Sequence, residues 1–303
     1  MKNYLCSFLE EFAYPEAACT VLLQGFDVIT NDSSALEAFT AILDTYKADK
    51  LCDFKELIAR MRELSARIGL QEYTGNVILL ICMSETLKTY YEEAGMDETV
   101  WYDSMIDLKY KLDECHCVHG IWGIFVPNWY KGFFRMTLFG FPKLQFEAVP
   151  FGRHYEKDGI VLTPDSTVLD THIPRTGGRL DEAGRIHSYQ LGAAFFAKHF
   201  GITQPVFVCH SWLLFPRNKE ILSPQSNLCA FISDFDIIES GEYDTYKAVW
   251  RLFDRHYEGD VDALPQDSSL RRAYADWIRK GEKTGWGYGV NTKFTNPFCH
   301  ENF

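Results

Sequence analysis

The chain has 303 residues, with 30 Lys and Arg against 42 Asp and Glu, which gives a formal net charge of −12 at neutral pH. This length suits one large domain or two, and a hydrophobic content of 47% excludes an intrinsically disordered chain. The acidic balance disfavours nucleic acid as a partner, because Lys and Arg supply most of the non-specific affinity for phosphates.

The amino terminus and the cysteines indicate where the protein works. Glu10 and Glu11 stand where a secretory signal would need an apolar core, so we expect no signal peptide. The longest dense apolar stretch, 77–83, is far shorter than the roughly 20 residues that cross a bilayer, so no membrane partner is expected. Nine cysteines without an export signal are typical of reduced thiols. We therefore expect a cytoplasmic protein.

The first part of the chain has a helical pattern, in which apolar residues recur at spacings of three and four. Asp32 and Asp53 are suited to begin helices, and Gly69 and Gly120 are suited to end them. The pattern predicts about five or six helices. We expect residues 1–125 to form an N-terminal α-helical bundle.

After Gly120 the pattern changes to strands and turns. Ten aromatic residues fall between 121 and 151, where Gly and Pro interrupt helical spacing. Two further strand candidates, 166–174 and 205–215, flank a helical segment that is long enough to connect parallel neighbours. Residues 126–303 are therefore expected to form a mixed α/β sheet domain, which makes the whole chain a two-domain α+β protein.

A glycine-containing loop lies between the first of these two strands and the following helix. Gly177 and Gly178 let backbone N–H groups point outward, and the helix N-terminus adds partial positive charge, which suits a phosphate or pyrophosphate. Arg175 and Arg179 would reinforce this charge. The candidate phosphate-binding residues are Arg175, Thr176, Gly177, Gly178 and Arg179. The alternative is a plain turn with solvated arginines.

The same loop resembles that of a known family. Arg175 and Gly178 fit the R/Q-x-x-G-x-G/A loop of the GNAT acyltransferases, whereas Leu180 stands where Gly or Ala is usual. A longer series of motifs resembles, in the same order, bacterial proteins that join a helical N-acyltransferase N-terminal domain to a GNAT-like C-terminal domain. These motifs are DSMIDLKYKLDEC (103–115), FGFPKLQFE (139–147), LDTHIP (169–174), CHSWLLFP (209–216), SNLCAF (226–231) and LPQDSSLRRA (264–273).

The resemblance covers residues 95–290 well and the earlier helices more loosely. It implies that acyl-CoA, for example acetyl-CoA, lies in the opening between the splayed strands 168–173 and 206–214, with its pyrophosphate at the start of the following helix. It implies transfer of an acyl group from the CoA thioester to a nucleophile, commonly an amine, and does not identify the acceptor. The partners expected are thus a small-molecule acyl donor and an amine acceptor.

Acyl transfer to an amine needs a base, because an ammonium group must lose a proton before it attacks. His172 is the best candidate, since it ends a strand and imidazole exchanges protons near neutral pH. Asp170 should share its face and could orient His172 or act through a water. On the next strand, His210 and Ser211 point to opposite faces; we favour Ser211, in the SWLL motif, as a hydrogen-bonding or proton-relay group. For all three, a purely structural hydrogen bond is the alternative.

Two other kinds of site receive less support. Cys115, His116, Cys117 and His119 raise the possibility of zinc, but four ligands within five residues cannot easily surround one ion, so no metal is expected. No GxSxG elbow surrounds Ser211, which argues against a serine hydrolase.

A non-enzymatic function from a different class stays open. Since the Leu at 180 replaces a small residue and no catalytic Glu or Tyr is obvious, the chain could be a GNAT-derived acyl-CoA-binding or interaction module without turnover.

Charge is distributed unevenly along the chain. Residues 1–125 hold 10 Lys and Arg against 21 Asp and Glu, a net of −11, whereas residues 126–303 hold 20 against 21, a net of −1. The near-neutral second half does not oppose an anionic CoA ligand, and the acidic first half could attract a cationic acceptor such as an amine.

Overall fold

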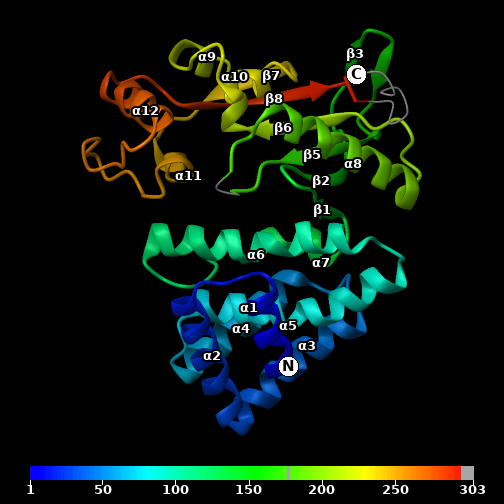
Figure 1. Ribbon diagram of the computed structural model, residues 1–303, viewed down its shortest axis with the longest axis vertical. Helices are drawn as coiled ribbons and strands as arrows, with labels where there is room; N and C mark the ends of the chain where they lie inside the picture. Colours follow the sequence, from blue (N-terminus) through cyan, green and yellow to red (C-terminus); the bar gives the residue numbers. More distant parts are fainter. Residues whose placement is uncertain (176–177, 295–303) are drawn as a thin grey trace. The chain divides into compact units, whose positions relative to one another are not determined.

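The computed structural model describes residues 1–175 and 178–294. The chain forms two compact units, Met1–Gly140 and Phe141–Phe303. Figure 1 colours the first from blue to green and the second from green to red. No helix among the described residues combines the length and the apolar character that a membrane span needs.

The first unit is the predicted helical bundle. Its long helices are α1 (Lys2–Glu11), α2 (Glu16–Asn31), α3 (Ser33–Ala48), α4 (Phe54–Ile68), α5 (Glu72–Glu93) and α6 (Glu98–His119). The expected caps are confirmed: the Asp32 side chain accepts a hydrogen bond from the Ala35 N–H at 2.9 Å, and Gly69 and Gly120 end α4 and α6 with φ of 69° and 71°. Local sequence signals thus set where these helices begin and end.

The aromatic stretch after α6 packs within the first unit. It forms η1 (Pro127–Tyr130), α7 (Lys131–Phe134) and the short strand β1 (Leu138–Gly140). Phe133 and Phe134 are fully buried, and the Tyr46 hydroxyl donates to the Phe134 carbonyl at 2.9 Å. The aromatic composition that changes near residue 125 therefore belongs to the core of the helical unit as far as Gly140.

The second unit is a mixed sheet with helices, as predicted. Its strands are β2 (Gln145–Pro150), β3 (Tyr155–Lys157), β4 (Ile160–Leu162), β5 (Thr167–His172), β6 (Phe207–Ser211), β7 (Asp236–Glu242) and β8 (Gly285–Asn291). The strands that the second unit contributes to the main sheet have the order β2-β5-β6-β8-β7, in which β5 and β6 are parallel and the other pairs are antiparallel. Strands β3 and β4 form a separate hairpin.

The helical segments of the second unit connect these strands. They are α8 (Glu182–Phe200), η2 (Trp212–Leu214), α9 (Asn218–Ile221), α10 (Asn227–Ile232), η3 (Lys247–Val249), α11 (Trp250–Phe253) and α12 (Ser269–Arg279). Helix α8 follows β5 and leads to β6, so it is the crossover between the two parallel strands, as predicted (Figure 1).

Helix α8 packs on one face of the sheet. The ring of Tyr189 lies 5.6 Å from that of Phe146 and 4.8 Å from that of Phe207, and all three side chains are fully buried. A Cβ atom at Gly192 would come within 2.5 Å of the Phe146 ring, so a glycine allows helix and sheet to approach this closely. On the opposite face, a second cluster includes Phe151, Leu162, Val168, Val208 and Tyr288.

Candidate active site

The only parallel strand pair among the described residues opens at its carboxyl end. Strands β5 and β6 pair at two positions alone, Leu169 with Phe207 and Asp170 with Val208. Both strands continue beyond these pairs, to His172 and to Ser211. Backbone groups that leave a ladder need other hydrogen-bond partners, and ligands of open sheets bind at the carboxyl ends of parallel strands. The opening is therefore a candidate binding site.

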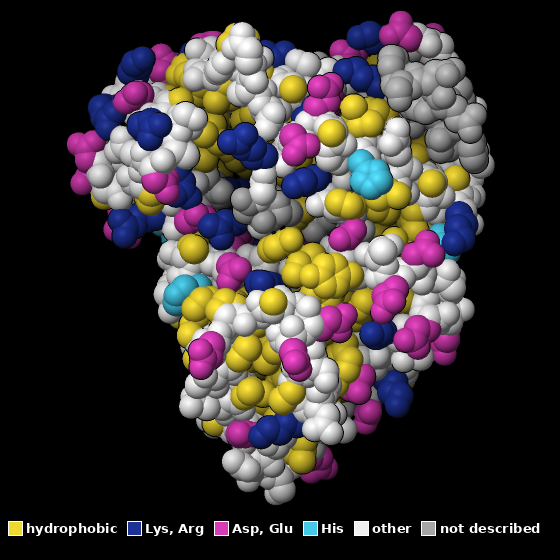
Figure 2. Space-filling model, viewed as in Figure 1, with side chains coloured by type: hydrophobic (Ala, Val, Ile, Leu, Met, Phe, Trp, Pro, Cys, Tyr) yellow, Lys and Arg dark blue, Asp and Glu magenta, His cyan; other side chains and the backbone are white. Residues whose placement is uncertain are grey.

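The second unit has a hollow on the face seen in Figure 2, with hydrophobic side chains inside it and several Lys and Arg side chains beside it. An apolar hollow with a basic border suits a ligand that carries both hydrocarbon and anionic groups.

Two acidic side chains and a histidine meet where the strands part. Asp170 lies directly opposite Glu147 of β2, and His172 is two residues further along β5 on the same face. The Nε2 atom of His172 is 3.7 Å from Asp170 Oδ2 and 3.9 Å from Glu147 Oε2. These side chains are about one quarter exposed, at 22% for His172, 26% for Asp170 and 29% for Glu147. The three side chains are thus partly exposed, whereas the His172 Nε2 and Asp170 Oδ1 atoms themselves are buried.

The surroundings of Asp170 change its acidity. Burial raises the pKa of the Asp170 carboxyl, His172 opposes the rise, and the neighbouring Glu147 charge adds to it. The carboxyl holds a proton more readily than a solvated aspartate does. An aspartate of this kind, beside an imidazole, can take part in proton transfer or stabilise a positive charge on its neighbour.

The structure brings Asp170 and His172 together and leaves Ser211 on the other face of the sheet. Because Val208 pairs with Asp170, the residue on β6 that shares their face is His210. The exposed His210 imidazole lies edge-on to the Trp286 ring at 4.8 Å. The Ser211 Oγ instead accepts a hydrogen bond from the Leu213 N–H at 3.2 Å and begins η2.

Sequence reasoning does not identify two residues on this face of the sheet, Glu147 and His210. Glu147 ends the motif FGFPKLQFE, but only the register of β2 against β5 shows that it faces Asp170. The SWLL motif favours Ser211 over His210, but strand alternation alone shows only that the two residues lie on opposite faces. The pairing of β5 with β6 supplies the missing information.

The proposed phosphate loop is held at both ends. An Arg175 nitrogen lies 2.6 Å from Asp254 Oδ2, and the same carboxylate binds Arg271. At the other end, the Asp181 side chain accepts a hydrogen bond from the Gly184 N–H at 2.7 Å and caps α8. Gly178 and Arg179 are exposed between these anchors, and the predicted residues Thr176 and Gly177 lie outside the described residues.

A third arginine near this loop has a structural role. Arg185 is 1% exposed and binds Asp234 at 2.9 Å and the Leu180 carbonyl at 3.2 Å. Its guanidinium therefore fixes the start of α8 to the rest of the second unit.

The Cys and His residues at the end of α6 have aromatic neighbours. His116 stacks on Trp122 with ring centroids 3.6 Å apart, and His119 lies against Phe125 at 4.7 Å. Among the described residues, no group of three or more His, Cys, Asp or Glu side chains is arranged to hold a metal ion.

Taken together, the fold and the site define a class of protein. A parallel strand pair that parts, followed by an Arg and Gly loop at the start of the crossover helix, is the arrangement implied for a GNAT-like acyltransferase.

Both units match known domain families. Residues 138–291 match the GNAT-like C-terminal domain, and residues 4–136 match the N-acyltransferase N-terminal domain. The chain therefore belongs to the family of acyltransferases that combine these two domains. This confirms the resemblance and the predicted fold class, and it gives the chain the chemistry of that family, acyl transfer from a CoA thioester. No curated protein matches the chain in sequence.

Solved structures share the fold at low sequence identity. A crystal structure of an acyltransferase in complex with decanoyl-CoA is 18% identical, with a TM-score of 0.72 over 94% of this chain and 86% of that one. An acyltransferase mutant in complex with octanoyl-CoA is 20% identical, with a TM-score of 0.75 over the same shares. An acyltransferase in complex with CoA and 10C-teicoplanin is 19% identical, with a TM-score of 0.69 over the same shares. At this identity the likeness establishes the fold alone.

Proposed function

We propose that this protein transfers an acyl group from acyl-CoA directly to the amine of a small molecule, with His172 as the base. The observation that supports this most is the position of the Glu147, Asp170 and His172 cluster where β5 parts from β6. The solved relatives in complex with teicoplanin or its 10C derivative add support for a small-molecule acceptor.

The cluster has the groups that the reaction needs. An acceptor amine is mostly an ammonium ion near neutral pH, and the carboxylates of Glu147 and Asp170 would attract it. His172 takes one proton from it, and Asp170 stabilises the imidazolium that results. The free amine attacks the thioester carbonyl, and the C–N bond forms as the C–S bond breaks. The CoA thiolate leaves and takes up the second proton, which the attacking nitrogen loses as it becomes an amide. Positioning of the two substrates in one cleft supplies much of the rate increase.

The acyl donor would occupy the opening and the loop that follows β5. Arg175, Gly178 and Arg179 are proposed to hold its pyrophosphate, together with the predicted residues Thr176 and Gly177. Because Asp254 already binds Arg175, the guanidinium is oriented before the ligand arrives. Ser211 stays a predicted relay group, and His210 is a second candidate for proton transfer because it shares the face of Asp170.

The test is a comparison of His172→Ala with the unchanged protein. We expect release of CoA thiol in the presence of an amine panel to fall at least about a hundredfold, as expected for loss of a general base, while calorimetric binding of acetyl-CoA is unchanged. His187→Ala, which removes an exposed histidine on α8, is the matched control. Undiminished transfer by His172→Ala would remove this histidine as the base.

The same experiment tests the alternative of a binding module without turnover. That alternative is motivated by Leu180, which stands in place of a small residue in the loop. Acyl-CoA binding without thiol release against the whole amine panel would favour the module over the enzyme.

A further inference from the structure

The connection between β7 and β8 forms a small apolar pocket beside the end of β6. Residues 243–284 carry their own hydrophobic cluster, which includes Val249, Phe253, Tyr274 and Ile278. The pocket has a volume of about 20 Å³, and a cavity of that size holds about one water molecule or a methyl group. Its principal walls are Trp212, Ala248, Val249, Leu252, Tyr274 and Thr284.

The pocket is close to the proposed donor site in two ways. Trp212 directly follows Ser211, and Ser211 is three residues beyond the last β5–β6 pair, which is about 10 Å along a strand. In addition, Asp254, which follows the pocket wall formed by α11, binds Arg175 of the proposed phosphate loop. Trp212 therefore connects the pocket to β6, and Asp254 connects it to the proposed phosphate loop.

The pocket is mostly apolar, and the hydroxyl-bearing residues in its lining are Tyr243, Tyr274 and Thr284. The Trp212 and Tyr274 rings meet edge to face at 5.6 Å, and Tyr274 is tied by its hydroxyl to Asn218. Thr284 is 6% exposed, and its Oγ1 is buried with no hydrogen-bond partner among the described residues. A buried hydroxyl is unfavourable until a ligand or a water pairs with it. Its position in the wall marks a place for one oxygen atom.

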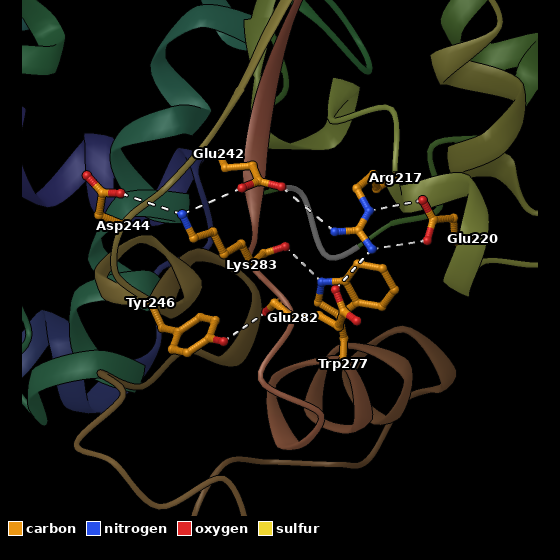
Figure 3. A network of polar contacts seen from close by, with 8 residues as sticks. All are labelled: Arg217, Glu220, Glu242, Asp244, Tyr246, Trp277, Glu282 and Lys283. Atoms are coloured by element: carbon orange, nitrogen blue, oxygen red, sulfur yellow. Dashed lines mark hydrogen bonds and ion pairs between the residues drawn. The ribbon is translucent and has the colours of Figure 1, made fainter.

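A polar network fixes the segment that carries this hydroxyl. Figure 3 shows Arg217 between Glu220, Glu242 and Glu282, with its guanidinium 4.6 Å from the Trp277 ring.

The same network holds the backbone just before Thr284. The Trp277 indole donates to the Lys283 carbonyl at 2.9 Å, and the Tyr246 hydroxyl donates to the Glu282 carbonyl at 2.8 Å (Figure 3). The two residues before Thr284 are thus held from two elements, and the pocket wall is built before any ligand binds.

We infer that a short acyl chain of two to four carbons ends at the mouth of this pocket, which takes either its terminal methyl group or, preferentially, a hydroxyl or keto oxygen next to that methyl group. The inference rests on the proposed function and specifies its acyl donor. Trp212 limits the length of the chain, and the Thr284 hydroxyl pairs with its oxygen substituent. Trp212 is only partly buried and forms one wall of the pocket.

The experiment measures binding by calorimetry and transfer by thiol release for acetyl-, butyryl-, 3-hydroxybutyryl-, octanoyl- and decanoyl-CoA. The unchanged protein should bind 3-hydroxybutyryl-CoA about tenfold more tightly than decanoyl-CoA. Trp212→Leu should improve the octanoyl to butyryl ratio about tenfold, and Ala248→Phe should reduce the butyryl to acetyl ratio by a similar factor. Thr284→Val should remove the preference for 3-hydroxybutyryl over butyryl.

Leu270→Ala is the control, because it shortens a side chain that packs on the same cluster but does not line the pocket. The inference is overturned if the unchanged protein binds decanoyl-CoA best. It is also overturned if the pocket variants leave the chain-length ratios unchanged or alter the KM of the amine alone. Binding that follows the expected ratios without any transfer would instead support the pocket and contradict the proposed enzymatic function.

Discussion

Glu147 and Asp170 face each other directly across β2 and β5. The Nε2 atom of His172 lies close to both carboxylates, 3.9 Å from Glu147 Oε2 and 3.7 Å from Asp170 Oδ2. Two like charges opposite each other on adjacent strands destabilise a sheet. A positive charge between them, on an imidazolium or an acceptor ammonium, relieves the repulsion. The pair therefore favours a cation at this position, such as the acceptor ammonium.

Glu147→Gln removes one of the two carboxylates beside His172 while keeping the shape of the side chain. We expect kcat/KM for the amine to fall about tenfold, because the acceptor ammonium loses one of the two carboxylates that attract it. Thiol release as a function of amine concentration measures this effect, and added salt should reduce the difference between the variant and the unchanged protein. Glu156→Gln, on the exposed part of β3, should leave kcat/KM unchanged. A purely structural role for Glu147 would lower activity by a factor that does not depend on salt.

Asp170→Asn should change how stability depends on pH. The pKa of the Asp170 carboxyl is raised in the folded protein, mainly by burial, so the folded state binds more protons than the unfolded state once pH rises above the ordinary value for aspartate. The contribution of this group to the free energy of unfolding therefore decreases as pH rises through that range. Thermal denaturation from pH 4 to pH 7 should show a smaller loss of stability for Asp170→Asn. An unchanged profile would show that Asp170 titrates normally.

Arg175→Ala should weaken binding of the acyl donor. Loss of a charged hydrogen bond to phosphate is expected to raise the KM for acyl-CoA about tenfold or more, with little change in kcat, because the guanidinium is remote from the thioester. Added salt should raise the KM of the unchanged protein more than that of the variant. Arg272→Ala, whose guanidinium donates to the exposed Gln266 carbonyl, serves as the control. Equal affinity for acyl-CoA in both variants would contradict the loop assignment.

Gly192→Ala should destabilise the second unit, although alanine is the better helix former. The added methyl group would lie 2.5 Å from the Phe146 ring, in a fully buried contact. Overpacking of this kind costs about 1 to 3 kcal/mol, more than the gain of about 1 kcal/mol in helix propensity. Chemical denaturation measures the difference, and the exposed change Ala194→Ser is expected to have little effect. A more stable Gly192→Ala protein would show that Phe146 can move aside at little cost.

The features of this fold that depend only on residues close together in the sequence were predictable. Asp32, Gly69 and Gly120 act as helix caps because capping needs only residues within one turn of the helix end. Tyr189 is buried, as its spacing with other apolar residues on α8 indicates. The crossover from β5 to β6 followed from the distance between two strand candidates.

The composition of the site was predictable only in part. Asp170 and His172 share a face because they are two residues apart on one strand. The roles of Glu147 and His210 depend on which residues of β2, β5 and β6 stand opposite one another, and alternation along a single strand carries no information about that register. The pocket behind Trp212 needs the folded β7–β8 connection, because its walls come from residues that are far apart in the sequence, such as Trp212, Leu252 and Tyr274.

The aromatic segment that ends the first unit determines how the protein can be divided. Tyr130, Phe133 and Phe134 are fully enclosed by that unit. A fragment that stops at residue 125 would lose all three rings, each of which contributes about 1.5 to 3 kcal/mol when buried. The complementary fragment would begin with this apolar segment exposed to water, which favours aggregation. Production of either unit alone therefore requires a cut close to Gly140, where the helical core is already complete.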